Sequence, residues 1–349
     1  MSKRWKIGIY GAGMISEVHA RALASIENVE LVGVYARSEE KARAFADRYH
    51  CRAFYGDAQD FFKAIEVVTV TSPSGFHLEP TEMAANAGVH VICEKPLEIS
   101  LNRIDQMIKI CAENKVTLCG IFPRRFHPVV EVCRQAITSG RLGKITSCSA
   151  YIKWWRSQAY YDSGAWRGTW QLDGGGALMN QSIHTIDLLQ YLVGDVDFVH
   201  ALTATLAHEN LEVEDHASAL LKFKNGALGV IEGSTSCYPG HTAEIQISGS
   251  KGSIFLEDHQ LKVWQFVEQD ENDELIRKEF GAHQGGGAGA ADPKAIPDDW
   301  HRMNFEDALF AIEHQTVPTV DGKAARKSVE IIAGIYDSAQ QEGKRIYLK

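Results

Sequence analysis

The stretch GIYGAGMIS, residues 8–16, sets the fold class of the N-terminal third of the chain. It joins an apolar, strand-like segment to a helix-like segment and carries the pattern Gly11-x-Gly13-x-x-Ser16. Gly11 permits a tight turn, Gly13 lets a pyrophosphate approach the backbone, and the N–H groups at the start of the helix bind phosphate. Ser16 replaces the third glycine of the pattern and is small enough to pack against the strand. The sequence therefore predicts a dinucleotide site.

Residues 1–122 continue this alternation of apolar strand-like runs and helix-like segments. Such alternation predicts right-handed βαβ units and a parallel sheet, and near-continuous apolar strands favour a sheet covered on both faces. We expect residues 1–122 to form a Rossmann dinucleotide-binding domain.

Residues 123–349 have a different texture, with longer strand-like runs that predict a large, open, mostly antiparallel sheet. An Asn-Gly pair at 225–226 predicts a hairpin. We expect helices near 176–193, 300–314 and 323–342, a Gly/Ala/Pro linker or mobile loop at 281–298, and a C-terminal helix that packs back on the first domain. The expected strand runs are 145–155, 197–207, 214–224, 226–237, 241–248, 252–257 and 260–268. The fold class is thus α/β plus α+β.

Composition excludes several classes of protein. The chain has 349 residues, which favours two domains, and a net charge of -9, which argues against nucleic acid or an anionic membrane as a partner. We see no secretory signal and no run of 18 apolar residues. Seven cysteines without a C-x-x-C pair predict reduced thiols, no zinc motif and a cytoplasmic protein.

The end of the second strand-like run bears on the choice of dinucleotide. An acidic residue there would bind the adenosine ribose and favour NAD. This chain has Ala36-Arg37-Ser38 instead. Arg37 could stack on adenine or pair with a 2′-phosphate, or could be a solvated residue at the start of a helix. The sequence predicts NAD(P), with NADP slightly favoured.

Three further stretches carry a family resemblance: TSPSGFH (71–77), CEKPLE (93–98) and DGGGALMNQSIHTIDLLQYLVG (173–194). Together they resemble the Gfo/Idh/MocA oxidoreductase family, which includes glucose–fructose oxidoreductase and inositol dehydrogenases. The resemblance implies a Rossmann domain that binds NAD(P), a C-terminal open-faced sheet that carries the substrate, and homodimers or homotetramers formed through that sheet. With KWWRSQAYYDSGAWRGTW (153–170), the third stretch also looks like the UDP-N-acetylglucosaminuronate 3-dehydrogenase branch.

The resemblance also implies the cofactor contacts. They are Gly11, Gly13, Met14, Ile15, Arg37, Ser38, Ser72, Pro73, His77, Glu94 and Lys95.

Lys95 is the first of the expected catalytic residues. It stands at the C-terminal end of a parallel strand, where α/β sheets bind ligands. We expect the Lys95-Pro96 peptide bond to be cis. The resemblance implies that the Lys95 ammonium hydrogen-bonds the substrate hydroxyl and stabilises the alkoxide charge that develops there.

His184 is the expected proton acceptor, because histidine titrates near neutral pH. Asp187 lies on nearly the same helix face and is expected to orient the imidazole or contact substrate. Many family members have an aspartate four residues before the histidine. Here it is Asn180, which can position a substrate oxygen but cannot act as a base. A second departure is Pro123, where a polar side chain often sits near the nicotinamide.

A loop-rich stretch supplies most of the expected substrate contacts. Aromatic rings stack on sugars and arginines bind carboxylate or phosphate, although a packed interdomain loop would also explain the composition. The expected substrate residues are Arg124, Arg156, Tyr161, Trp166, Arg167 and Asn180, with Tyr160 in the same stretch and Arg125 a weaker candidate.

The leading function is hydride transfer between nicotinamide and a ring carbon of a sugar, cyclitol or nucleotide sugar. One alternative is an NAD-dependent glycoside hydrolase that oxidises C3 transiently, and another is a non-catalytic dinucleotide sensor. The acidic cluster Glu212, Glu214, Asp215 and His216 does not predict a metal, because alternate residues of a strand face opposite sides. No metal site is expected.

Overall fold

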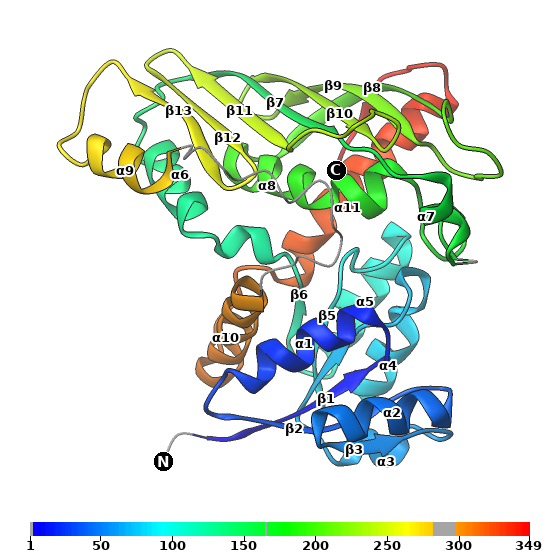
Figure 1. The fold of residues 1–349 in the computed structure, drawn as a ribbon. Helices are drawn as coiled ribbons and strands as arrows, with labels where there is room; N and C mark the ends of the chain where they lie inside the picture. Colours follow the sequence, from blue (N-terminus) through cyan, green and yellow to red (C-terminus); the bar gives the residue numbers. More distant parts are fainter. Residues whose placement is uncertain (1–2, 165, 282–297) are drawn as a thin grey trace. The chain divides into compact units, whose positions relative to one another are not determined.

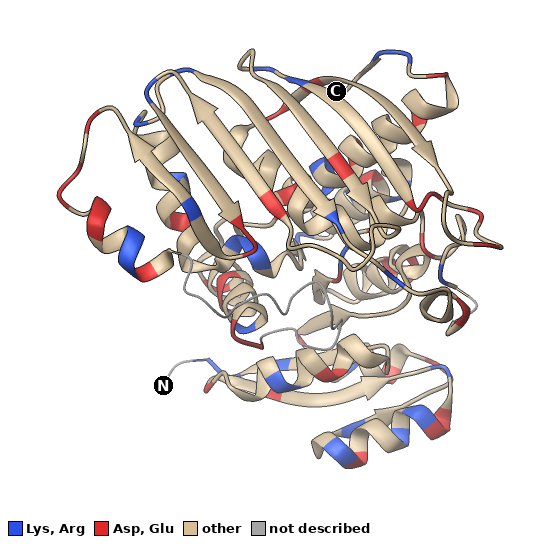
Figure 2. Ribbon diagram, turned by 45° about the horizontal axis from the view of Figure 1, so that its top comes forward, with Lys and Arg blue, Asp and Glu red and all other residues tan. Residues whose placement is uncertain are grey.

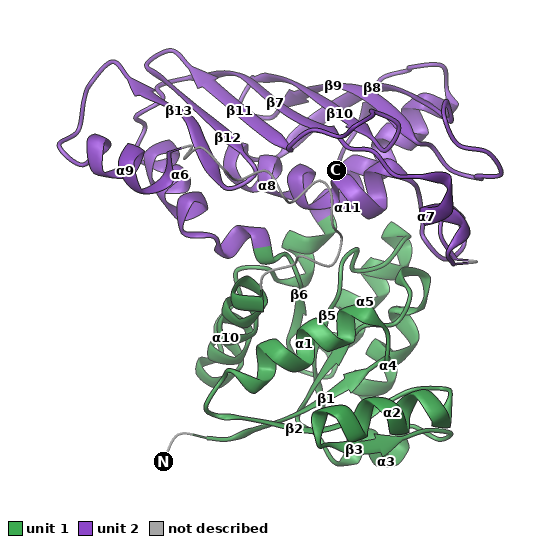
Figure 3. Cartoon of the chain, in the orientation of Figure 1, with its two compact units in different colours: residues 1–123, 296–326 green, residues 124–295, 327–349 purple. Residues whose placement is uncertain are grey.

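The chain divides into two compact units. The computed structural model describes residues 3–164, 166–281 and 298–349. Unit 1 comprises residues 1–123 and 296–326, and unit 2 comprises residues 124–295 and 327–349 (Figure 3). Part of the C-terminal segment, residues 296–326, therefore groups with the N-terminal residues in unit 1. Most of the expected linker, residues 282–297, lies outside the described residues.

Unit 1 is built on a six-stranded parallel sheet with the order β3-β2-β1-β4-β5-β6 (Figure 1). Every residue of β4 is buried, as expected for a central strand covered on both faces. The strands are β1 (Trp5–Tyr10), β2 (Val29–Tyr35), β3 (Arg52–Phe54), β4 (Val67–Val70), β5 (His90–Cys93) and β6 (Leu118–Gly120). The intervening helices are α1 (Met14–Ala24), α2 (Glu39–Tyr49), α3 (Gln59–Lys63), η1 (Ser74–Phe76), α4 (Leu78–Asn86) and α5 (Leu101–Glu113).

The C-terminal piece covers the β6 edge of this sheet. The N–H of Gly120 donates to the carbonyl of Val320 at 2.8 Å, and the N–H of Phe122 donates to the side chain of Asn304 at 2.9 Å. Asn304 lies on α10 (Asp298–His314), and α11 (Gly322–Gln340) follows. The edge strand thus gains partners from a segment distant in sequence.

Unit 2 contains an eight-stranded sheet with the order β13-β12-β11-β7-β10-β9-β8-β14. All neighbouring pairs are antiparallel except β7 and β10, which are parallel. The strands are β7 (Ile145–Lys153), β8 (Val196–Ala204), β9 (His216–Phe223), β10 (Leu228–Ser234), β11 (Glu244–Gly249), β12 (Gly252–Glu257), β13 (Gln260–Phe266) and β14 (Ile346–Tyr347). The predicted fold class and the predicted strands are confirmed.

Helices cover one face of this second sheet, and the other face is open (Figure 2). The π-helical turn η3 and α8 pack on this covered face, and α11 is tied to β8 by a 2.8 Å hydrogen bond from the N–H of Ala201 to Ser338. The helical segments of this part are η2 (Pro123–Phe126), α6 (Pro128–Thr138), α7 (Gln158–Asp162), η3 (Ala177–Ser182), α8 (Ile183–Val193) and α9 (Asp273–Phe280). Helices α3, α6, α7 and α9 were not predicted from the sequence. Among the described residues, no helix is long and apolar enough to cross a membrane.

Candidate active site

The glycine-rich turn after β1 has the geometry that the sequence predicts. Gly11 has φ of +124°, and a Cβ there would lie 2.6 Å from the hydroxyl of Thr71. Ser16 is buried; its hydroxyl accepts the N–H of Gly13 at 3.0 Å and pairs with Thr71 at 2.9 Å. Ser16 therefore ties the first turn of α1 to Thr71, the residue that follows β4, which a third glycine would not do.

The start of α1 has room for a phosphate. A Cβ built on Gly13 would meet no atom within 4 Å, and Met14 beside it is 55% exposed. The first N–H groups of a helix lack partners within the helix and point along its axis. The turn therefore fits the pyrophosphate of a dinucleotide.

The end of β2 offers a cation in place of a carboxylate. Ala36 is buried, Ser38 caps α2 by accepting the N–H of Lys41, and Arg37 is exposed. The guanidinium of Arg37 lies 5.7 Å from the ring of Phe76, which is 40% exposed. Two planar groups are thus presented to solvent beyond the carboxyl end of the sheet.

His77 ties together the loops that follow β4 and β5. Its ring nitrogens lie 2.7 Å from the carbonyl oxygen of Ser72 and 3.0 Å from that of Pro96. The ring is buried and both nitrogens face protein oxygens, so the expected cofactor contact of His77 finds no support in this geometry. The predicted cis bond between Lys95 and Pro96 is confirmed.

Glu94 fixes the backbone of Lys95 and is itself held by α1. Its carboxylate accepts the N–H of Lys95 at 2.9 Å and lies 2.8 Å from Nε2 of His19. Burial opposes ionisation, but the hydrogen bond from His19 and nearby positive charge lower the pKa of Glu94 to about 2. Among described residues, His19, Glu94 and His301 lie close enough to share a metal, but the His19–Glu94 hydrogen bond already pairs two of the three.

In unit 2, η3 and α8 carry the expected catalytic pair Asn180 and His184. Asn180 donates to the carboxylate of Asp173 at 2.7 Å, and the other oxygen of Asp173 accepts the N–H of Gly168 at 3.0 Å. This contact orients the Asn180 amide, whose oxygen receives a long 3.4 Å contact from Gln181. His184, four residues on, is partly exposed. Asp173 was quoted in the sequence motif but given no role there.

Asp187 does not have the role expected from its spacing. Its two carboxylate oxygens accept from Arg125 at 2.6 and 2.7 Å, and both side chains are buried. The guanidinium also lies 4.5 Å from the ring of Tyr191. This pair anchors α8 to the segment before α6 and leaves Asp187 occupied by Arg125. The neighbouring Arg124 donates to Thr185 at 3.3 Å, beside His184.

Tyr160 is the centre of a polar group in the stretch 153–170, which is called the substrate loop here because the sequence predicts substrate contacts in it. Its hydroxyl accepts from Arg167 at 2.6 Å and from Gln181 at 2.7 Å, and Gln181 accepts from Arg156 at 3.1 Å. The guanidinium of Arg167 also lies between the rings of Tyr160, at 4.2 Å, and Trp166, at 4.7 Å. Because two N–H groups occupy the lone pairs of the Tyr160 oxygen, its hydrogen remains to be donated.

The adjacent Tyr161 points elsewhere. It is buried, and its hydroxyl pairs with that of Thr235 at 2.6 Å. Tyr160, which is only partly buried, is a better candidate for substrate contact than Tyr161, which was expected from the sequence.

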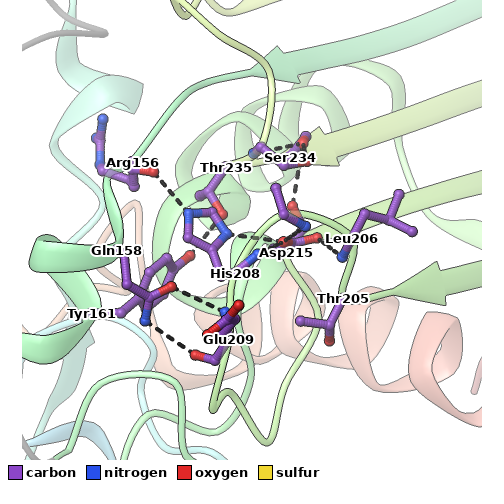
Figure 4. A network of polar contacts seen from close by, with 12 residues as sticks. Arg156, Gln158, Tyr161, Thr205, Leu206, His208, Glu209, Asp215, Ser234 and Thr235 are labelled. Atoms are coloured by element: carbon purple, nitrogen blue, oxygen red, sulfur yellow. Dashed lines mark hydrogen bonds and ion pairs between the residues drawn. The ribbon is translucent and has the colours of Figure 1, made fainter.

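A buried histidine holds the substrate loop in place (Figure 4). His208 lies 2.9 Å from the carboxylate of Asp215 through Nδ1 and 2.8 Å from the carbonyl oxygen of Arg156 through Nε2. Both partners are acceptors, so the ring makes both hydrogen bonds only when each nitrogen carries a hydrogen. The neighbouring acids diverge: Glu212 accepts the N–H of Trp170, and Glu214 turns toward η3. The side chains of these two acids therefore do not point to a common position.

The two matching family models cover most of the chain. Residues 5–121 match the model of the oxidoreductase family with an NAD-binding Rossmann fold, and residues 130–255 match the GFO/IDH/MocA C-terminal domain. The chain belongs to the Gfo/Idh/MocA family of oxidoreductases. As a member, it has an NAD-binding Rossmann unit joined to the family's C-terminal domain.

Its relatives differ in their named activities. Myo-inositol 2-dehydrogenase of Thermotoga maritima is 30% identical over 72% of this chain and 75% of its own length. The WlbA dehydrogenase of Bordetella pertussis, solved in complex with NADH and UDP-GlcNAcA, is 31% identical, covers 100% of this chain and 99% of its own, and has a TM-score of 0.88. The 2,7-anhydro-N-acetylneuraminate hydratase of Escherichia coli is 29% identical over 72% of this chain and 67% of its own length.

Proposed function

We propose that this oxidoreductase transfers a hydride between nicotinamide and a ring carbon of an anionic sugar, with a nucleotide-linked uronate as the preferred substrate. The observation that carries the proposal is Arg167. Its Nε is buried without a hydrogen bond, and no carboxylate among the described residues forms an ion pair with it. The Arg167 residue as a whole is half-buried, and a substrate carboxylate or phosphate would stabilise a partly desolvated cation that lacks a counter-charge. The bound UDP-GlcNAcA of the WlbA structure is a molecule of this kind.

We assign the steps of this chemistry to individual side chains. The glycine-rich turn at Gly11 and Gly13 would hold NAD⁺, which would supply the hydride acceptor for the CH–OH carbon. Lys95 donates a hydrogen bond to the hydroxyl oxygen and stabilises negative charge there, and neutral His184 accepts the hydroxyl proton. Asn180, held by Asp173, positions a second substrate oxygen. The products are a ketone, NADH and a proton.

Absorbance at 340 nm with purified protein tests this proposal. The panel contains inositols, neutral sugars, free uronates and UDP-linked uronates, each with NAD⁺ and NADP⁺. We expect turnover of anionic sugars and fastest turnover of the UDP-linked acid. Turnover of inositol alone would contradict the anionic substrate. Product formation without a net change in absorbance at 340 nm would favour the second candidate, a hydratase or hydrolase that retains its cofactor. The similarity to the Escherichia coli hydratase is the reason for considering this candidate.

Replacing Tyr160 by phenylalanine should raise the KM for the anionic substrate about 10-fold and change kcat little, because one hydrogen bond to a charged group is lost from binding. Tyr161→Phe is the matched control. It removes a buried hydroxyl bonded to Thr235 and should lower the melting temperature without changing KM. Equal effects of the two variants on KM would show that Tyr160 does not contact substrate.

We also propose that NADP is accepted through Arg37. Arg37→Ala should lower kcat/KM for NADP⁺ about 10- to 100-fold, the value of a charge-assisted contact with the 2′-phosphate, and leave NAD⁺ within a few-fold. Arg43→Ala, which removes an exposed arginine paired with Glu39 on α2, is the control. A parallel fall for both dinucleotides would assign Arg37 to adenine stacking instead.

A second copy of the chain is proposed to cover the open sheet face. Leu202, Leu220 and Leu228 on adjacent strands are 61–65% exposed, and the strands carry few charges (Figure 2). Burial of this apolar face would form a homodimer or homotetramer, whose mass can be measured by light scattering.

We also propose a cytoplasmic location, which the seven free thiols support.

A further inference from the structure

Glu214, in the turn before β9, closes the N-terminal end of η3. One carboxylate oxygen accepts the N–H of Gly176 at 3.0 Å, and the other accepts the N–H of Leu178 at 2.8 Å. The backbone carbonyl of Glu214 accepts the N–H of Ala177 at 3.0 Å. One residue therefore satisfies three successive N–H groups at a helix start, where such groups otherwise lack partners.

Two of the glycines before η3 lie where no Cβ could be accommodated. A Cβ on Gly176 would lie 1.8 Å from the carbonyl oxygen of Glu214, and a Cβ on Gly175 would lie 2.1 Å from the hydroxyl oxygen of Tyr336. Any larger residue would push the helix start away from its cap. These glycines allow three chain segments to approach closely: the start of η3, the turn at Glu214 and the helix α11 that carries Tyr336.

Tyr336 completes the cap from α11. Its hydroxyl donates to Glu214 at 3.0 Å across 122 residues of sequence, and the ring of Trp170 packs edge-on against it at 5.1 Å. Glu214 and Tyr336 are both buried. No charged side chain among the described residues forms an ion pair with Glu214, so the cap consists of hydrogen bonds from neutral donors.

We propose that Glu214 and Tyr336 are positioning residues, which set the start of η3 and thereby the presentation of Asn180 and His184. The helix start would otherwise attract an anion. Because the protein's own carboxylate fills it, an anionic substrate group has to be recognised by the arginines of the substrate loop. The kinetic part of this inference rests on the proposed function, whereas the structural part does not.

Protonation should weaken this cap. Burial raises the pKa of Glu214 to about 7, although hydrogen bonds from Leu178, Tyr336 and Gly176 act to lower it. Among the described residues, Tyr336 and Tyr161 are titratable side chains that interact with the Glu214 carboxyl. A protonated carboxyl offers one oxygen less as a good acceptor, so the cap is best formed above pH 7. The effect on stability has the opposite sign, because the folded chain binds this proton more tightly than the unfolded chain. The contribution of Glu214 to unfolding free energy is therefore fully present at low pH and is lost as pH rises through about 7.

The experiment compares Glu214→Gln and Tyr336→Phe with Glu209→Gln and Tyr238→Phe, two exposed control sites. Hydrogen exchange of the segment 174–186 should accelerate in Glu214→Gln, whose amide N–H₂ faces one of the two backbone N–H groups. Its kcat should fall about 10- to 100-fold with unchanged NADH affinity. Tyr336→Phe removes a donor to the ionised carboxylate, so the acid limb of its kcat profile should move to higher pH.

Several results would overturn the inference. Exchange and kcat equal to those of the controls would do so, and so would a lower melting temperature with unchanged kcat per folded molecule, since that shows a structural role alone. If the wild type turns over no sugar, the proposed function fails, and the exchange measurement still decides whether Glu214 caps η3.

Discussion

Replacing Lys95 by methionine should reduce kcat by about 10³-fold or more while NADH still binds. Methionine has nearly the length of lysine but no charge, so the substrate hydroxyl loses the group that stabilises its developing negative charge. The backbone at residue 95 is held independently by Glu94, which accepts the Lys95 N–H at 2.9 Å, so the loop should keep its shape. Single-turnover absorbance at 340 nm separates the chemical step from product release.

The control for this variant is Lys109→Met, an exposed lysine on α5 whose nearest ion pair, to Glu113, is 3.8 Å long. It should leave kcat within two-fold, because exposed pairs of this kind contribute little. A Lys95→Met enzyme that keeps more than a tenth of wild-type kcat would show that the hydroxyl is activated by another residue.

Gly176→Ala should destabilise the protein by about 3 kcal/mol or more, the largest stability effect that we expect from a single methyl group. The new Cβ would lie 1.8 Å from a backbone oxygen, and backbone atoms cannot rotate away as a side chain can. The helix start must move and lose N–H bonds to Glu214, so activity should fall as well. Urea unfolding followed by circular dichroism measures the change.

Gly140→Ala is the matched comparison for this substitution. Gly140 has φ of +79°, but a Cβ there would meet no atom within 4 Å. It should cost about 1 kcal/mol, from backbone strain alone. If both variants lose the same stability, the close approach at Gly176 relaxes without cost and the cap is softer than the geometry indicates.

The parts of this molecule that follow from local patterns were predictable. The turn at Gly11 and most strands of the second sheet follow from short stretches of sequence, because periodicity and turn chemistry act over a few residues, whereas the short strands β3 and β14 were not predicted. The Asn225-Gly226 hairpin is an example: β9 and β10 pair antiparallel on either side of it. The family resemblance of the three motif stretches added the cofactor and the reaction class.

Side-chain partners distant in sequence were not predictable. Helical spacing placed Asp187 on the face of His184, but nothing local indicated that Arg125, 62 residues away, would occupy both oxygens. The contact between Glu214 and Gly176 joins residues 38 positions apart, which no local pattern reveals. Tyr160 and Tyr161 are adjacent and chemically identical, so only tertiary packing separates their roles.

The parallel pairing of β7 with β10 bears on how unit 2 assembles. The register pairs residues 81 positions apart, such as Cys148 and Gly229, and no hairpin can bring them together. The substrate loop, η3 and α8 all belong to the chain between the two strands. Closing so long a loop is entropically slow, so during refolding this ladder should form late. Catalytic competence would then be acquired in the final steps of folding, and nascent or damaged chains would bear an incomplete site until the central ladder has closed.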